Sequence, residues 1–402
     1  MNVQVTQQAK EDALAPLLRQ AFRPMFLFGA LFSVLAMALW GLVLSGAVSL
    51  NPYANVVFWH QHEMLFGFVA AIIVGFLLTA VQNWTGVRAT HGYPLLWLTL
   101  IWLAGRLLML FGGSVPAVLV AVVDLAFLPT AALFFAAILL KAGKLKNMFF
   151  VPVLLLLAVC NLLMHLGVLL NQFHFISHGS TNAVWLITLI MAVVSGRVLP
   201  MFTANGTQTP RVQPVAWLDK LALGSLWLIF ALHFFLLVQY IPSAVMSALF
   251  AVAALATLVR LVRVRFWVTL KVPLVWSLHV AVAFIPIGLA LFALRYAGMN
   301  ISASTAIHAL TAGAMGIMIL SMMARVSLGH SGRPLQPKRL MTLAFMLIIV
   351  AASVRVITGG WFPVSALGWY SWAIAAWVLA YGFYIVIYFP ILTTPRADGR
   401  PG

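Results

Sequence analysis

Residues 58–82 read FWHQHEMLFGFVAAIIVGFLLTAVQ. The second half of this stretch is an apolar run without a charged residue, and the whole stretch exceeds the roughly 20 residues that an α-helix needs to cross a bilayer. Its first half carries His60, His62 and Glu63. Ionisable groups at this depth are costly unless they are paired or ligated. The stretch therefore predicts a membrane span with a candidate site near one end.

Further segments have the same apolar character, so the sequence predicts an all-α polytopic membrane protein with about twelve transmembrane helices. The composition agrees, because 64% of the residues are hydrophobic and only 7% are charged, against about 25% charged in a soluble domain. We expect one transmembrane domain over residues 25–390, between a cytoplasmic segment 1–24 and a cytoplasmic tail 391–402. The expected spans are 25–48, 58–82, 93–112, 115–140, 148–171, 180–201, 215–238, 241–263, 273–296, 301–326, 337–359 and 365–390.

The formal net charge of +17 comes from basic residues that lie almost entirely in short loops on one side of these spans. Only Arg295 and Arg355 fall on the other side, which predicts cytoplasmic N- and C-termini. The basic residues therefore set the orientation of the protein in the membrane. We expect the lipid bilayer as a partner and no nucleic acid. The residues on the basic side are Lys10, Arg19, Arg23, Arg88, Lys141, Lys144, Lys146, Arg211, Lys220, Arg260, Arg263, Arg265, Lys271, Arg333, Lys338, Arg339, Arg396 and Arg400.

Two of the expected spans share a short pattern. His62 is followed five residues later by Gly67, and His308 is followed five residues later by Gly313. The spans 180–201 and 301–326 also both end on an Arg-Val pair before a turn. The spans 58–82, 180–201 and 301–326 are the second, sixth and tenth in chain order. Because they are four apart, the sequence permits three pseudo-repeats of four helices.

The histidines predict where a metal could bind. Cys160 is the one cysteine, which excludes an intramolecular disulfide and thiol-based metal clusters. A metal must therefore use His, Met or carboxylate ligands. Three histidines belong to the cytoplasmic half, namely His91, His279 and His330. The other seven are expected toward the outer face, with His174 and His178 flanking a loop: His60, His62, His165, His174, His178, His233 and His308.

His60 and His62 are expected to face different neighbours, because residues two apart in a helix project about 200° apart. This spacing suits a helix between two redox centres, with one imidazole on a haem iron and the other on copper. Gly67 would let a flat macrocycle approach the backbone closely. Glu63 could fix a ligand imidazole, bind a metal directly or relay a proton. For His165 and His308, ligation and ordinary hydrogen-bonded packing both stay open.

Arg106 and Asp124 occur at similar depth on either side of the Gly112-Gly113 turn. The first interpretation of this pair is a structural ion pair within the membrane. The second is that Arg106 contacts a haem propionate.

The sequence resembles the NnrS family in three motifs. These are AFRPMF at 21–26, WHQHEMLFGF at 59–68 and GFLLTAVQNWTG at 75–86. The similarity covers essentially the whole chain, although Gln82 stands where many members have Pro. The resemblance implies a bacterial inner-membrane protein that holds haem, expected to be b-type, and copper, and that takes part in nitric oxide metabolism and tolerance to nitrosative stress.

These arguments together give a first hypothesis of a haem- and copper-binding protein that acts on nitric oxide. In it, His62 and His308 hold haem, aided by Gly67 and Arg106, while His60 and His165 hold the second metal and Glu63 passes protons. A nitric oxide reductase would also need electrons from a quinol or a periplasmic donor. Two alternatives stay open: a haem-based scavenger or sensor of nitric oxide without turnover, and a twelve-helix secondary transporter.

Overall fold

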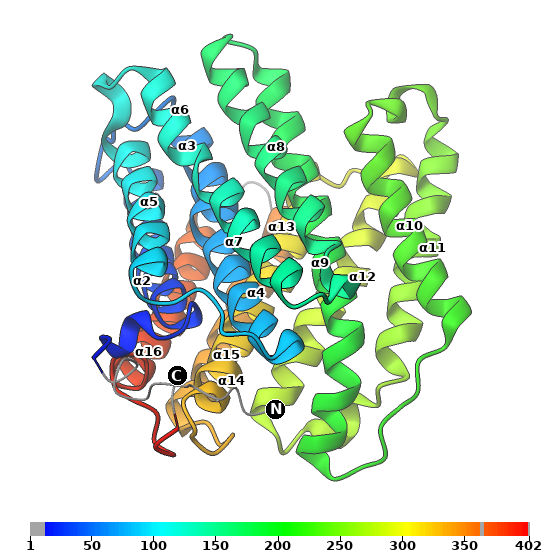
Figure 1. The fold of residues 1–402 in the computed structure, drawn as a ribbon. Coiled ribbons are helices and arrows are strands. Elements are labelled where there is room, and N and C mark those ends of the chain that lie inside the picture. Colours follow the sequence, from blue (N-terminus) through cyan, green and yellow to red (C-terminus); the bar gives the residue numbers. More distant parts are fainter. Residues whose placement is uncertain (1–12, 362–365, 401–402) are drawn as a thin grey trace. The chain divides into compact units, whose positions relative to one another are not determined.

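The computed structural model describes residues 13–361 and 366–400, and within these ranges it contains helices and no strand (Figure 1). Twelve helices there are long and apolar enough to cross a membrane. The predicted fold class is therefore confirmed. Parts of the predicted segments 1–24, 365–390 and 391–402 lie outside the described residues.

The twelve spans overlap the twelve predicted segments one by one, and several consist of two shorter helices. The helices are α2 (Phe22–Leu44), α3 (Val56–His62), α4 (Ala70–Thr85), α5 (Gly92–Phe111), α6 (Ala117–Leu125), α7 (Phe127–Lys141), α8 (Phe150–Leu169), α9 (Phe173–Thr207), α10 (Ala216–Phe234), α11 (Ser243–Val262), α12 (Pro273–Tyr296), α13 (Ala303–His308), α14 (Gly316–His330), α15 (Arg339–Trp361) and α16 (Ala366–Thr393).

The chain forms two compact units. The second unit consists of Val184–Met322 and Gln336–Ala380, and the first unit holds the remaining residues. Helices α2 to α8 belong to the first unit, and α10 to α13 belong to the second. The single transmembrane domain expected over 25–390 stays a prediction.

Two spans contain a π-helical turn directly after a histidine. His62 ends α3 and is followed by the π-helical segment Glu63–Val69, and His308 ends α13 and is followed by the π-helical segment Ala309–Met315. The shared sequence pattern therefore corresponds to a shared backbone feature. Single π turns inside α-helices are rare and occur frequently at functional sites. The arrangement of three repeats of four helices stays a prediction.

The start of α3 is fixed by a helix cap. The Asn55 side chain accepts hydrogen bonds from the backbone N–H groups of Val57 (3.0 Å) and Phe58 (2.9 Å). These N–H groups have no partner within the helix, so the cap satisfies two donors that the first turn leaves unpaired. The cap fixes where α3 begins, and thereby the direction in which His62 and Glu63 project from it.

The prediction that His174 and His178 flank a loop is wrong. Both lie in α9, which begins at Phe173, whereas the expected span began at residue 180. Gly179, which suggested a turn, is a packing residue: a Cβ atom there would collide with the Cys160 carbonyl oxygen of α8. Close contact between helices in a membrane favours small residues at the interface. This explains why the helix continues through the glycine.

Candidate metal centre

Helices of the first unit bring six polar side chains together inside the membrane-spanning region. Each has 4% or less of its surface exposed, so the cluster is sealed from water. They are His62 at the end of α3, Glu63 in the π-helical segment, Arg106 of α5, Asp124 of α6, and Asn161 and His165 of α8.

Asp124 lies at the centre of this cluster. Its Oδ2 atom is 3.1 Å from His62 Nε2 and 3.1 Å from His165 Nε2, and it accepts a hydrogen bond from Asn161 Nδ2 at 2.8 Å. Its Oδ1 atom is ion-paired with the guanidinium of Arg106. The ion pair predicted between Arg106 and Asp124 is therefore present, and the other carboxylate oxygen faces two imidazoles.

His62, Asp124 and His165 could together hold a metal ion. One ligand atom from each lies within 4.8 Å of the others. Ligands about 2.0–2.1 Å from an ion in a tetrahedral site are about 3.3 Å apart, which is close to the distances around Asp124 Oδ2. Imidazole and carboxylate ligands suit copper, zinc and iron. The geometry thus fits a transition metal once the ligands give up their hydrogen bonds to one another.

The second nitrogen of each imidazole also has a partner. His62 Nδ1 lies 2.9 Å from Glu63 Oε1, which is also ion-paired with Arg106. His165 Nδ1 lies 3.3 Å from the Tyr53 hydroxyl. Burial, and secondarily the negative charge of Asp124, raise the pKa of Tyr53 to about 12, so this hydroxyl stays neutral. Metal-binding histidines commonly have such partners, which fix the ring orientation.

The charges of the cluster favour a cation. Glu63 and Asp124 carry two negative charges against the one positive charge of Arg106, so the cluster with neutral imidazoles has a net charge of −1. Within the described part of the chain, the buried Glu63 Oε2 atom has no hydrogen-bond partner. An unpaired buried carboxylate oxygen is costly. A bound cation, or a proton on His62, would neutralise the cluster.

The structure places the four predicted histidine ligands in different surroundings. His62 and His165 lie together, with ring centroids 5.2 Å apart. His60 stacks on Trp40 of α2 at 4.4 Å, so His60 and His62 do face different neighbours. His308 belongs to the second unit, where its Nδ1 atom lies 2.7 Å from the Ser304 carbonyl oxygen. Metal or haem binding by these four histidines stays a prediction.

The structure gives Gly67 a different role from the one expected. A Cβ atom at this position would lie 2.6 Å from Arg106 Nη1 and 2.7 Å from a ring carbon of Phe32. The absence of a side chain therefore lets Arg106 approach Glu63 and Asp124. The close approach of a macrocycle to Gly67, and a contact between Arg106 and a propionate, stay predictions.

Sequence reasoning missed Asn161 of the cluster and its neighbour Tyr53, and it found only one of the two roles of Asp124. Asp124 was assigned to an ion pair alone, and Asn161 and Tyr53 were not singled out. Asn161 stands four residues before His165 in the same apolar span, so both lie on one face of α8. That spacing is a signal that could have found it. Tyr53 lies in a loop, where no periodicity predicts which way a side chain points.

The fold and the cluster define a class: a multi-pass membrane protein with a buried histidine and carboxylate group that could hold a metal. A family profile described as NnrS protein matches residues 16–396, and the chain belongs to this family. No curated protein matches the sequence.

Proposed function

We propose that this chain binds haem and copper in the bacterial inner membrane and acts on nitric oxide, with both termini in the cytoplasm. The observation that supports it most is the buried group of His62, Asp124 and His165, which has the ligand types and the net negative charge for a copper ion. Membership of the NnrS family supports the link to haem, copper and nitric oxide. The excess of basic loops on one side supports the orientation.

We assign copper to His62, Asp124 and His165. This differs from the assignment by sequence, which gave His62 to haem and paired His165 with His60. The reason is distance, since His62 and His165 share the Asp124 Oδ2 atom, while the His60 ring is stacked on Trp40. Glu63 and Tyr53 would orient the two imidazoles.

His308 is the candidate haem ligand. Its Nδ1 atom is positioned to donate to the Ser304 carbonyl at 2.7 Å, which makes Nε2 the basic ring nitrogen, as in axial histidine ligands. Arg355 donates to the Ser304 hydroxyl at 2.9 Å and packs over the Tyr370 ring at 4.2 Å. A fixed arginine next to the histidine is a suitable partner for a haem propionate. His308 and Arg355 therefore have the chemistry to hold a haem.

The sealed position of the copper site suits nitric oxide, because this small molecule partitions into lipid and needs no water-filled channel. When bound, haem and copper supply nitric oxide binding and electron transfer. Reduction of two molecules of nitric oxide to nitrous oxide and water consumes two electrons and two protons, which a quinol or a periplasmic donor with water would supply. Glu63 can hold a proton on its Oε2 atom, which has no hydrogen-bond partner among the described residues, while its Oε1 atom contacts His62.

The test is a metal and pyridine-haemochrome analysis of the purified protein and of alanine variants. We expect copper to be lost in His62→Ala, Asp124→Ala and His165→Ala, and haem to be lost in His308→Ala. His60→Ala is the matched control, two residues from His62, and should keep both. Loss of copper in the His60 variant would favour the assignment made from sequence. Purified protein with neither haem nor copper would overturn the proposal.

Turnover is measured separately, by following nitric oxide consumption with a reduced quinol analogue. Consumption of many molecules of nitric oxide per molecule of protein supports a reductase. Consumption that stops at one or two molecules per protein supports a scavenger or sensor. Transport of a solute in proteoliposomes by protein that carries no chromophore would support the transporter alternative.

A further inference from the structure

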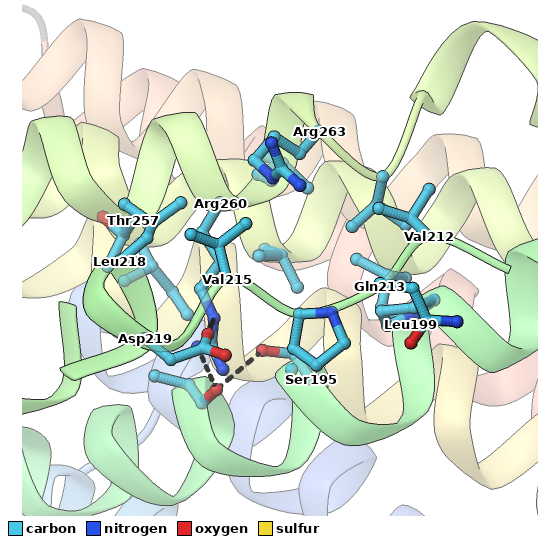
Figure 2. A pocket seen from close by; sticks show the side chains of 18 of the residues that line it. Ser195, Leu199, Val212, Gln213, Val215, Leu218, Asp219, Thr257, Arg260 and Arg263 are labelled. Carbon is cyan, nitrogen blue, oxygen red and sulfur yellow. Dashed lines mark hydrogen bonds and ion pairs between the residues drawn. The ribbon is translucent and has the colours of Figure 1, made fainter. Parts of the chain in front are cut away.

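A pocket lies within the second unit, on the side predicted to be cytoplasmic. Figure 2 shows Asp219, Arg260 and Ser195 around one part of it and Val212 and Gln213 around another. Its walls come from α9, α10, α11 and α12 and from the loop between α9 and α10. None of its residues belongs to the metal centre described above.

Arg260 lines this pocket and is held by contacts within the protein. Its Nε atom donates to Asp219 Oδ1 at 2.6 Å, and its Nη1 atom donates to the Ala192 carbonyl at 2.7 Å. The guanidinium lies directly against Gly196, where a Cβ atom would collide with it. The side chain is only 18% exposed. A cation held this way keeps its position whether or not a ligand is present.

The pocket has an excess of positive charge. Arg211 and Arg263 line it together with Arg260, and both are exposed to solvent. Asp219 is the one carboxylate among its lining residues in the described part of the chain. Three arginines against one aspartate give a net charge of +2, and much of the remaining wall is aliphatic. The ligand that matches is an anion with an apolar body.

The loop that carries Arg211 is held in place. Arg265 Nη2 donates to the Pro210 carbonyl at 2.7 Å, and the hydroxyls of Thr207 and Thr209 are 2.8 Å apart. Proline at 210 and at 214 restricts the backbone on both sides of Arg211. A loop fixed in this way loses little conformational freedom when a ligand binds.

Two exposed tryptophans near the pocket indicate the depth of the lipid head groups. Trp217 is 66% exposed and Trp267 is 50% exposed, and each stands within three residues of a residue that lines the pocket. Exposed tryptophans gather at the membrane–water interface. Basic pockets between transmembrane helices on the cytoplasmic side are suited to anionic head groups.

We propose that this pocket binds an anionic phospholipid of the cytoplasmic leaflet. The phosphate lies between Arg211 and Arg263, near Arg260, and the upper part of an acyl chain packs on Leu218 and Leu261. The site would attach the second unit to the leaflet by a specific contact. The proposal rests on the predicted orientation and is independent of haem and copper.

The experiment measures thermal unfolding of the full chain in nanodiscs of neutral phosphatidylcholine with increasing phosphatidylglycerol. We expect phosphatidylglycerol to raise the melting temperature of the wild type. In the double variant Arg211→Gln/Arg263→Gln, the concentration for half of this effect should rise about 30-fold, which corresponds to about 2 kcal/mol. Both side chains are exposed, so the variant should fold, and its melting temperature in pure phosphatidylcholine checks this.

The matched control is Lys338→Gln/Arg339→Gln. It removes two exposed positive charges from the same predicted side, outside the pocket. An equal loss in both double variants would show non-specific surface attraction and would overturn the proposal. Stabilisation of detergent-solubilised protein by inorganic phosphate alone, without lipid, would reassign the pocket to a soluble anion and would also overturn it. Haem and copper content, measured in the same samples, reports on the metal centre separately.

Discussion

The Nε2 atom of His62 lies 3.1 Å from the Oδ2 atom of Asp124, and both side chains are fully buried. The other oxygen of this carboxylate is paired with Arg106. Asp124 therefore joins an ion pair to a group of imidazoles, and the two roles can be separated by mutation. Removing the arginine changes the charge of the cluster, whereas removing a histidine changes its ligands.

The contact between Glu63 Oε1 and His62 Nδ1 predicts a moderate effect on metal affinity. Groups that orient a ligand histidine typically change metal affinity by about 10–100-fold when mutated. We expect Glu63→Gln to weaken copper binding by this amount while one copper still binds at saturation, as measured by competition with a copper chelator. Loss of all copper at saturation would show instead that Glu63 is a direct ligand.

Arg106 stabilises two buried carboxylates, so its removal should destabilise the fold. We expect Arg106→Gln to lower the free energy of unfolding by about 3–5 kcal/mol, because breaking a buried ion pair leaves uncompensated charge. The measurement is thermal unfolding in detergent. Adding Asp124→Asn to this variant should recover part of the loss. If the single variant is as stable as the wild type, the two carboxylates are not both charged in the folded protein.

A side chain at position 67 should destabilise the protein, because it would collide with Arg106. We expect Gly67→Ala to lower the melting temperature and weaken copper binding, because the added Cβ would lie 2.6 Å from Arg106 Nη1. Gly224→Ala is the control: it is also a helical glycine, but nothing lies within 4 Å of its added Cβ. A copper affinity that is unchanged in Gly67→Ala would separate Gly67 from the metal centre.

The spans could be predicted from sequence because each depends on a local property, the length of an apolar run. The spans from 58–82 to 337–359 are recovered with small shifts of their ends, apart from 180–201, which the structure extends to Phe173–Thr207. The start of α9 was misplaced because Gly179 has two possible uses, a turn or a close helix contact. Only the neighbouring Cys160 carbonyl decides between them, and sequence does not show that neighbour.

The candidate site was predicted in part. His62 and Glu63 were identified because ionisable residues in an apolar span are unusual, and Arg106 and Asp124 because opposite charges occurred at equal depth. Which histidines lie together could not be predicted, since His165 meets His62 only through the packing of α8 against α6 and α3. The π turns also could not be predicted, although the His and Gly pattern marks both of them.

The C-terminal tail provides a prediction about pH. Arg396 donates to the His330 carbonyl at 2.7 Å, and the Ala397 N–H donates to the Ser331 carbonyl at 2.9 Å, so the tail docks on the residues after α14. Asp398 accepts from Arg396 Nε at 2.9 Å. This hydrogen bond, more than any other contact, lowers the pKa of Asp398 to about 2.

Arg396 and Asp398 both belong to the tail, so their pair contributes to docking by holding the Arg396 side chain in place for its bond to the His330 carbonyl. The released tail loses this ordered pair, so the pKa of Asp398 rises there toward its ordinary value of about 3.9, and the carboxylate stabilises docking above that value. The contribution is lost as pH falls through about 4 toward 2, because the proton then binds the released tail more readily than the docked one. We expect pepsin to cleave the tail faster at pH 2 than at pH 4, after correction for its activity on an unstructured peptide. In Asp398→Asn the corrected rate should be fast at both values. A wild-type rate that does not change over this range would mean that the pair with Asp398 does not hold Arg396 in place for its bond to the His330 carbonyl.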